Sequence, residues 1–168
     1  GVADTLLDLP DVTVRPGGVS EVRGVLKNLD VKTWSEFEPT LYGLRVVLLD
    51  GERATDDLFD RVGFREVTVR GRELLLNGKP LRLRGYNRHE DHGLFGNSLP
   101  LEAMAADLEI LRDLGCNFIR TCHYPNDLRF LDLCDEMGFY VWEESHARNV
   151  PFGHPRFREQ IADSTREM

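Results

Sequence analysis

The chain has 168 residues, of which 41% are hydrophobic and 30% are charged, a composition that argues for a folded globular protein and against disorder. Its formal charge of −8 argues against nucleic-acid binding through bulk electrostatics, because that binding requires clustered Lys and Arg. No apolar run reaches the roughly 18 residues needed to span a bilayer, and the first residues lack the pattern of a signal peptide. We therefore expect neither a nucleic-acid nor a membrane partner.

The amino-terminal part, residues 1–68, has the alternating pattern of β-strands and no helical stretch. Val12 and Val14 alternate with polar neighbours, residues 20–29 alternate less regularly, and residues 41–51 end at Asp50 and Gly51, a pair typical of hairpin turns. Several short strands of this kind predict part of a β-sandwich.

A second hairpin is predicted at residues 74–83, where Asn77 and Gly78 suit a turn with positive φ at both positions. After it, the apolar spacing becomes helical. Residues 100–114 predict an amphipathic helix, with Pro100 in its first turn and Gly115 just past its end.

The remaining residues alternate between strands and helices. Residues 117–125 begin as a strand, and Asn126 is expected to cap a helix that ends at Met137. Residues 139–142 predict a buried strand with Trp142 in the core, and a third helix is expected to open at His154 and Pro155. This order predicts βαβ units with a parallel sheet, in either an open sheet or an unfinished barrel. No phosphate-binding glycine motif follows a strand, so a nucleotide-binding sheet has little support.

The three cysteines, Cys116, Cys122 and Cys134, follow no common zinc spacing and lie in apolar segments. We expect free, buried thiols. Free thiols and the lack of a signal peptide favour a reducing compartment, so a cytoplasmic location is predicted.

Polar residues concentrate after each predicted strand, at residues 85–92, 120–126 and 143–148. In parallel α/β folds, ligands bind at the carboxyl ends of the strands. The three clusters are therefore expected to line one shared cleft.

Two stretches, NGKPLRLRGYNRHED and FIRTCHYPNDLRFLDLCDEMGFYVWEE, resemble the first three barrel strands of family 2 glycoside hydrolases, the β-galactosidase and β-glucuronidase group. The segments EFEPTLYGLRVVLLDG and VGFREVTV are similar to the last strands of the immunoglobulin-like domain that precedes that barrel. The resemblance covers residues 34–146. It implies a mixed fold: the C-terminal part of an immunoglobulin-like β-sandwich at residues 1–68, then the first three βα units of a (β/α)8 TIM barrel at residues 69–168.

The resemblance also implies a set of substrate-binding residues at the strand ends. Two histidines match sugar-contacting positions of the family, and an acidic residue matches one that contacts sugar hydroxyls in the glucuronidase branch. The arginine and glutamate of the set match strand-end residues, for which an ion pair that only stabilises the barrel rim is an open alternative. The predicted set is His89, Asp91, Arg120, His123, Glu144 and His146.

By this resemblance the chain is part of a retaining exo-β-glycosidase that acts on terminal β-galactosides or β-glucuronides without a cofactor. Retaining enzymes use two carboxyl groups about 5 to 5.5 Å apart. In the family these groups follow the fourth and seventh strands, and an Asn-Glu pair marks the acid/base. The chain contains no Asn-Glu pair, so we expect both catalytic carboxylates to be missing and the chain to be inactive. We also predict no metal, and in particular no magnesium site of the Glu-x-His kind.

Two other function classes stay open. A non-catalytic carbohydrate-binding or assembly module would use His89, Asp91 and His123, and would hide an unfinished barrel edge by self-association. A metal-dependent hydrolase would take its ligands from the strand ends: His89, His92, His123, His146 and Glu144.

Overall fold

The computed structural model describes residues 5–145, 148 and 150–168. By its internal contacts the chain divides into two units, Gly1–Lys32 and Thr33–Met168. Among the described residues, no helix has the length and apolar character to cross a membrane.

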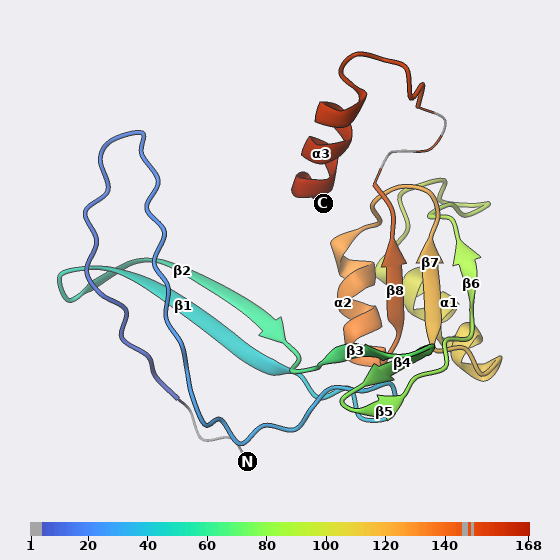
Figure 1. The fold of residues 1–168 in the computed structure, drawn as a ribbon, viewed down its shortest axis with the longest axis horizontal. Coiled ribbons are helices and arrows are strands. Elements are labelled where there is room, and N and C mark those ends of the chain that lie inside the picture. Colours follow the sequence, from blue (N-terminus) through green and yellow to red (C-terminus); the bar gives the residue numbers. More distant parts are fainter. Residues whose placement is uncertain (1–4, 146–147, 149) are drawn as a thin grey trace. The chain divides into compact units, whose positions relative to one another are not determined.

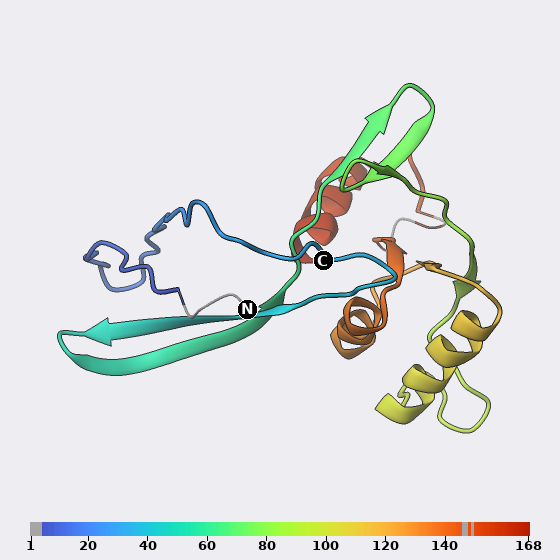
Figure 2. The same ribbon diagram turned by 90° about the horizontal axis from the view of Figure 1, so that it is seen from below.

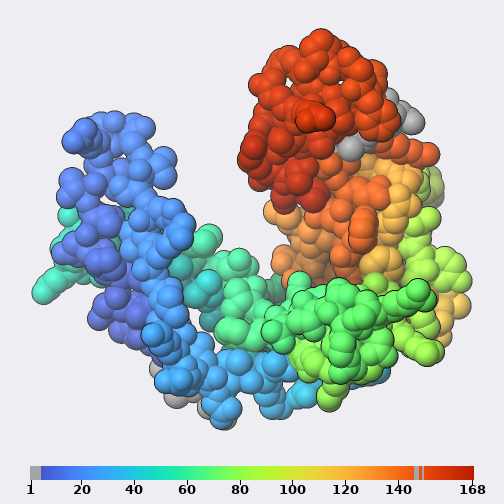
Figure 3. Space-filling model, in the orientation of Figure 1, coloured from blue at the N-terminus to red at the C-terminus, as the bar shows by residue number. Residues whose placement is uncertain are grey.

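The described part of the first unit, residues 5–32, contains no strand, so the strands predicted near Val12, Val14 and residues 20–29 are wrong. The side chains of Leu7 and Leu9 occupy the space that a Cβ atom on Gly24 would need. No ladder of backbone hydrogen bonds joins these segments, however. Alternation assigns faces to an extended segment, whereas a strand also requires a paired neighbour. The segment forms an open loop with exposed side chains (blue in Figure 3).

The second unit begins with a hairpin of β1 (Tyr42–Asp50) and β2 (Arg53–Val62), which form a two-stranded antiparallel sheet. Gly51, with φ at 61°, lies in the predicted turn. Large apolar side chains on both strands stay exposed, among them Phe59 at 66%. No second sheet packs on this hairpin within the described residues, so the structure does not show the expected partial immunoglobulin-like sandwich. The predicted domain boundary after residue 68 stays a prediction.

A second antiparallel sheet contains β3 (Val67–Arg70), β4 (Glu73–Leu76) and β5 (Lys79–Pro80). Asn77 and Gly78 have φ values of 49° and 77°, which confirms the predicted hairpin turn. The Asn77 side chain also accepts a hydrogen bond from the Glu66 amide at 3.0 Å.

Three parallel strands form the third sheet, in the order β6 (Gly85–Arg88), β7 (Phe118–Thr121) and β8 (Tyr140–Glu143). They alternate with α1 (Leu101–Asp113), α2 (Leu128–Met137) and α3 (Phe157–Glu167). The first two helices lie on the same face of the sheet (Figures 1 and 2). Sequential parallel strands with crossover helices on one face are the arrangement of a (β/α)8 barrel, although these three strands do not close into one.

The helix ends largely follow the predicted signals. Pro100 precedes α1, and Gly115 and Gly138 take positive φ after α1 and α2. The cap of α2 is Asp127, however, not Asn126. The Asp127 carboxylate accepts a hydrogen bond from the Arg129 amide at 2.9 Å, while Asn126 is buried and its side chain binds elsewhere.

The core lies between the sheet and the two helices. Its buried members are Leu99, Met104, Leu108, Ile119, Phe130, Cys134 and Phe139. Trp142 does not belong to it, contrary to the prediction, and is 60% exposed. Neighbouring strand residues point to opposite faces, so Trp142 lies on the face opposite Val141, which packs on the core.

The amino-terminal ends of the parallel strands are held by buried polar contacts. The Asn117 side chain accepts a hydrogen bond from the Arg84 amide at 2.8 Å and donates one to the Arg82 carbonyl at 3.0 Å. Trp34, which is 1% exposed, donates from Nε1 to the Asp135 carbonyl at 2.8 Å. These contacts lie at the amino-terminal ends of the strands. The carboxyl ends, on the opposite side of the sheet, are therefore available for a binding site.

Candidate functional site

The carboxyl ends of β6, β7 and β8 meet at one edge of the sheet, as predicted. Their last residues are paired in parallel register, so the side chains that follow them gather together. His89 follows β6 and His123 follows β7. Their ring centroids lie 5.5 Å apart, in an edge-to-face arrangement. The strand ends therefore converge, while a single cleft lined by all three polar clusters stays a prediction.

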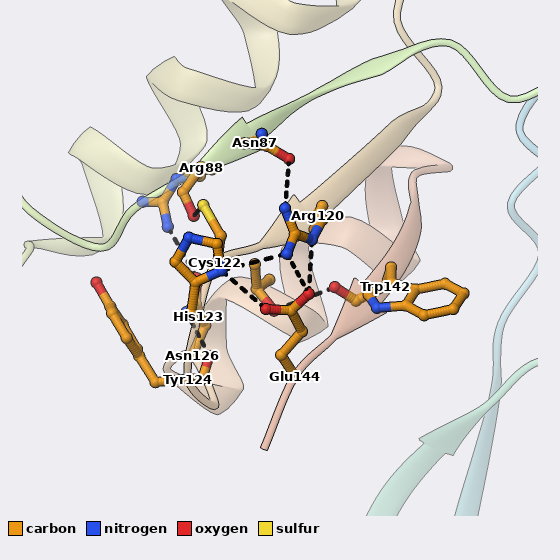
Figure 4. Close-up of polar contacts among 10 residues, drawn as sticks. Asn87, Arg88, Arg120, Cys122, His123, Tyr124, Asn126, Trp142 and Glu144 are labelled. Atoms are coloured by element: carbon orange, nitrogen blue, oxygen red, sulfur yellow. Dashed lines mark hydrogen bonds and ion pairs between the residues drawn. The ribbon is translucent and has the colours of Figure 1, made fainter. Parts of the chain in front are cut away.

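Arg120, His123 and Glu144 form a connected network (Figure 4). Two guanidinium nitrogens of Arg120, Nε and a terminal nitrogen, lie 2.6 and 2.5 Å from one carboxylate oxygen of Glu144. The other oxygen lies 2.9 Å from Nδ1 of His123. The predicted ion pair is thus present, and sugar contact by these residues stays a prediction.

This network decides which ring nitrogen of His123 carries hydrogen. A carboxylate only accepts hydrogen bonds and an arginine only donates them. Nδ1 lies 2.9 Å from Glu144 and 3.2 Å from Arg120, and it cannot satisfy both. The shorter contact, to an anion, places the hydrogen on Nδ1. Nε2 of a neutral His123 then keeps its lone pair for a ligand.

Glu144 is held in its ionised form. The hydrogen bond from His123, followed by that from Arg120, lowers the pKa of its carboxyl below the ordinary value. A general acid in glycoside hydrolysis needs a raised pKa instead. Glu144 is therefore suited to orienting its neighbours and to accepting hydrogen bonds, not to donating a proton.

Two further acidic residues, missed in the predicted set, hold the loop that carries His123. Glu90 accepts a hydrogen bond from the Asp127 amide at 3.0 Å, and Glu143 accepts one from the Asn126 amide at 3.0 Å. The peptide bond that precedes His123 is cis. Both glutamates lie within the polar clusters of the sequence, but their partners lie in the segment between β7 and α2, so spacing could not reveal them.

Arg88 is a structural residue. Its side chain is 7% exposed and turns toward the helices, with Nε 3.0 Å from Asp107 and a terminal nitrogen 3.3 Å from Asn126. The guanidinium also lies 4.0 Å over the ring of Phe130. Asn87, by contrast, accepts a hydrogen bond from Arg120 at 3.4 Å and so belongs to the edge of the network.

Other predicted residues are not part of this cluster. Asp91 is exposed, and the described part of the chain provides no hydrogen bond or ion pair between it and the cluster. His92 stacks on Phe95 at 4.9 Å. His146 lies outside the described residues. The prediction of no Glu-x-His magnesium site assumed that residues 143–154 lack this spacing, but Glu144 and His146 have it, so the sequence gives no ground for excluding such a site.

A different set of metal-ligating groups is present. One ligand atom each of His89, Cys122 and His123 lies within 4.8 Å of the others. Cys122 is buried with a free thiol, as predicted, and so is Cys134, whereas Cys116 is only half-buried.

An open pocket of about 450 Å³ lies beside the network, within the size range of small-molecule sites. Its lining residues are Arg120, His123, Glu144, Ser145 and Arg148.

The family model described as "Glycosyl hydrolases family 2, TIM barrel domain" matches residues 67–166. The chain belongs to glycosyl hydrolase family 2. This places the parallel sheet in the barrel domain of a glycosidase-type enzyme family, and the strand-end pocket where barrel enzymes bind their ligands.

Known relatives within family 2 cover most of the chain. It is 37% identical to a β-galactosidase of Streptococcus thermophilus over 90% of its length and 36% identical to a putative β-glucuronidase of Formosa agariphila over 85%. A family 2 β-galacturonidase of Eisenbergiella tayi, solved with bound galacturonate, superposes with a TM-score of 0.78 at 48% identity over 89% of the chain. The chain spans only 16% and 18% of the two curated relatives and 27% of that structure.

Proposed function

We propose that this chain is part of a retaining exo-β-glycosidase and supplies groups that bind the terminal sugar of a β-uronide, a substrate sugar that carries a carboxylate. The observation that carries the proposal is the strand-end pocket. In it the imidazole of His123, which contacts Glu144, lies next to the guanidinium groups of Arg120 and Arg148. The two catalytic carboxylates would come from elsewhere in the whole protein.

The network supplies the hydrogen-bonding pattern that a pyranose needs. Sugar hydroxyls both donate and accept, and Nε2 of His123 offers an oriented acceptor. His89 is exposed beside it and is free to bind a second hydroxyl. The half-buried carboxylate of Glu144 is fixed by Arg120, so the site is organised before the ligand arrives.

The charge of the pocket favours a uronide over a neutral galactoside. Glu144 neutralises Arg120, but among the described residues no carboxylate pairs with Arg148. One positive charge therefore remains in the pocket of a chain whose formal net charge is −8. The β-galacturonidase of known structure shares 48% identity with the chain, whereas the β-galactosidase of S. thermophilus shares 37% and the putative β-glucuronidase 36%. The proposal of a carboxylate on the substrate therefore rests on the charge of the pocket, and the similarity to the β-galacturonidase agrees with it.

Binding of free sugars to the purified chain tests this proposal. Calorimetric or NMR titration should show galacturonate or glucuronate binding more tightly than galactose. His123→Gln should weaken the binding of each sugar by about twofold to tenfold, the usual loss for a hydrogen bond between two neutral groups. Arg148→Gln should remove the preference for the uronates and leave galactose binding unchanged.

His92→Gln is the matched control, because His92 stacks on Phe95 and should not affect sugar binding. Equal affinity for galactose and galacturonate would contradict the uronide assignment. Turnover of nitrophenyl β-galacturonide or β-glucuronide by the chain alone should be absent, and robust hydrolysis would disprove the assignment of the catalytic pair to other segments.

A further inference from the structure

His89, Cys122 and His123 bring two imidazoles and a thiol together where β6 and β7 end. One ligand atom from each lies within 4.8 Å of the others. His89 is exposed, Cys122 is 2% exposed, and His123 is between these limits. A thiol with two imidazoles is a donor set that suits zinc and similar thiophilic ions, not the harder magnesium or calcium ions.

The contacts of His123 with Glu144 and Arg120 suit it to be a metal ligand. Metal-binding histidines usually donate their second ring N–H to a carboxylate, which fixes the tautomer and strengthens the ligand nitrogen. Glu144 makes this contact with Nδ1 at 2.9 Å, and Arg120 holds Glu144 in place. In Figure 4 the opposite edge of the His123 ring lies on the side of the Cys122 sulfur.

We propose that His89, Cys122 and His123 bind a thiophilic divalent transition-metal ion, with Zn²⁺ as the reference case, and that the bound ion excludes the sugar. The second half rests on the proposed function, because both ligands would need the imidazoles of His89 and His123. The site differs from the predicted metal-dependent hydrolase, which did not include Cys122, and its ion would inhibit instead of catalysing.

The geometry requires only a small adjustment. Zinc bonds to nitrogen and sulfur are about 2.0 to 2.3 Å long, so tetrahedral ligand atoms lie about 3.3 to 3.8 Å apart. Since no two of the present ligand atoms are more than 4.8 Å apart, they would have to close by at most about 1 to 1.5 Å, and the exposed side chain of His89 can rotate toward the other two. Cys122 would bind as thiolate and release its proton to solvent, and water would complete the coordination.

Metal titration of the chelator-treated, 168-residue chain tests the site directly. Calorimetry should show one Zn²⁺ per chain, and Co²⁺ should give the near-ultraviolet charge-transfer band of a thiolate ligand. His89→Gln and Cys122→Ser should each weaken Zn²⁺ binding by at least about tenfold, and Cys122→Ser should also abolish the band. No stoichiometric binding, or equal binding by these variants, would overturn the site.

Two controls separate the ligands from similar residues nearby. Cys116→Ser and His92→Gln should leave Zn²⁺ affinity unchanged, because neither residue belongs to the cluster. His89→Gln changes an exposed side chain, so its result does not depend on how well Cys122→Ser folds.

Sugar titrations with and without Zn²⁺ test the exclusion. Galacturonate affinity should fall at least tenfold when the metal site is saturated. Unchanged affinity would overturn the exclusion and leave the proposed function standing. If the chain binds Zn²⁺ but binds no sugar with or without the metal, both the exclusion and the proposed function are contradicted. The metal site itself is supported by that result.

Discussion

At the scale of single residues, Glu144 has two effects on the site: it neutralises the charge of Arg120, and it determines which nitrogen of His123 donates a hydrogen bond. One of its oxygens accepts from Arg120 and the other lies 2.9 Å from Nδ1 of His123. Because its pKa is lowered, the carboxyl stays ionised and keeps the hydrogen of His123 on Nδ1. The residue thus acts through its neighbours, by directing Nε2 toward a ligand.

We expect Glu144→Gln to reverse the tautomer of His123. Arg120 can only donate, so it would bind the amide oxygen and leave the amide nitrogen facing Nδ1. Nδ1 would then become the acceptor and the hydrogen would move to Nε2. Long-range ¹H–¹⁵N correlation spectra of the imidazole report this change. Glu143→Gln removes the same charge one residue away and should leave the tautomer as it is; an unchanged spectrum in Glu144→Gln would contradict the assignment.

At the scale of elements, the close approach of β6 and β7 brings the strand ends together. Gly85 opens β6 opposite Phe118, and a Cβ atom on it would overlap the carbonyl group of Phe118. Since a backbone group cannot move aside as a side chain does, only glycine fits there. The sequence stretch LRLRGYNR contains this glycine, but the reason for it lies in a strand more than 30 residues away.

Gly85→Ala should therefore lower the free energy of unfolding by about 3 kcal/mol, the upper range for inserting an atom into a packed region. Urea denaturation followed by circular dichroism measures this loss. Gly93→Ala is the matched control, because its added Cβ would meet nothing within 4 Å and its φ is not positive. A loss of similar size in both variants would show that strand spacing is not the cause.

At the scale of the whole molecule, β8 pairs only with β7 within the described residues and leaves one edge of the parallel sheet open. Trp142 on this strand is 60% exposed. Unpaired strand edges with apolar side chains are templates for pairing with another chain. This feature supports the earlier hypothesis of self-association.

We expect the chain to show a mass that rises with concentration in light scattering, and Trp142→Lys to reduce that rise by adding charge to the edge strand. Phe152→Lys is the control, because Phe152 is 83% exposed but lies outside the strands. A constant monomer mass for the unchanged chain would contradict the expectation.

The sequence by itself determined the local features of this protein. The hairpin at Asn77 and Gly78, the end of α2 at Gly138 and the succession of three parallel strands all follow from turn chemistry and apolar period. The motifs around His89 and His123 also gave the family, which the comparisons confirm. These features depend on residues close together in the chain.

The tertiary structure alone decided which side chains touch. It added His123 to the predicted pair of Arg120 and Glu144, moved the cap of α2 to Asp127, exposed Trp142, and brought Cys122 beside two histidines. It also left residues 5–32 without strands. Alternation and spacing describe which face a side chain occupies, whereas partners across a sheet depend on register and on packing between distant segments.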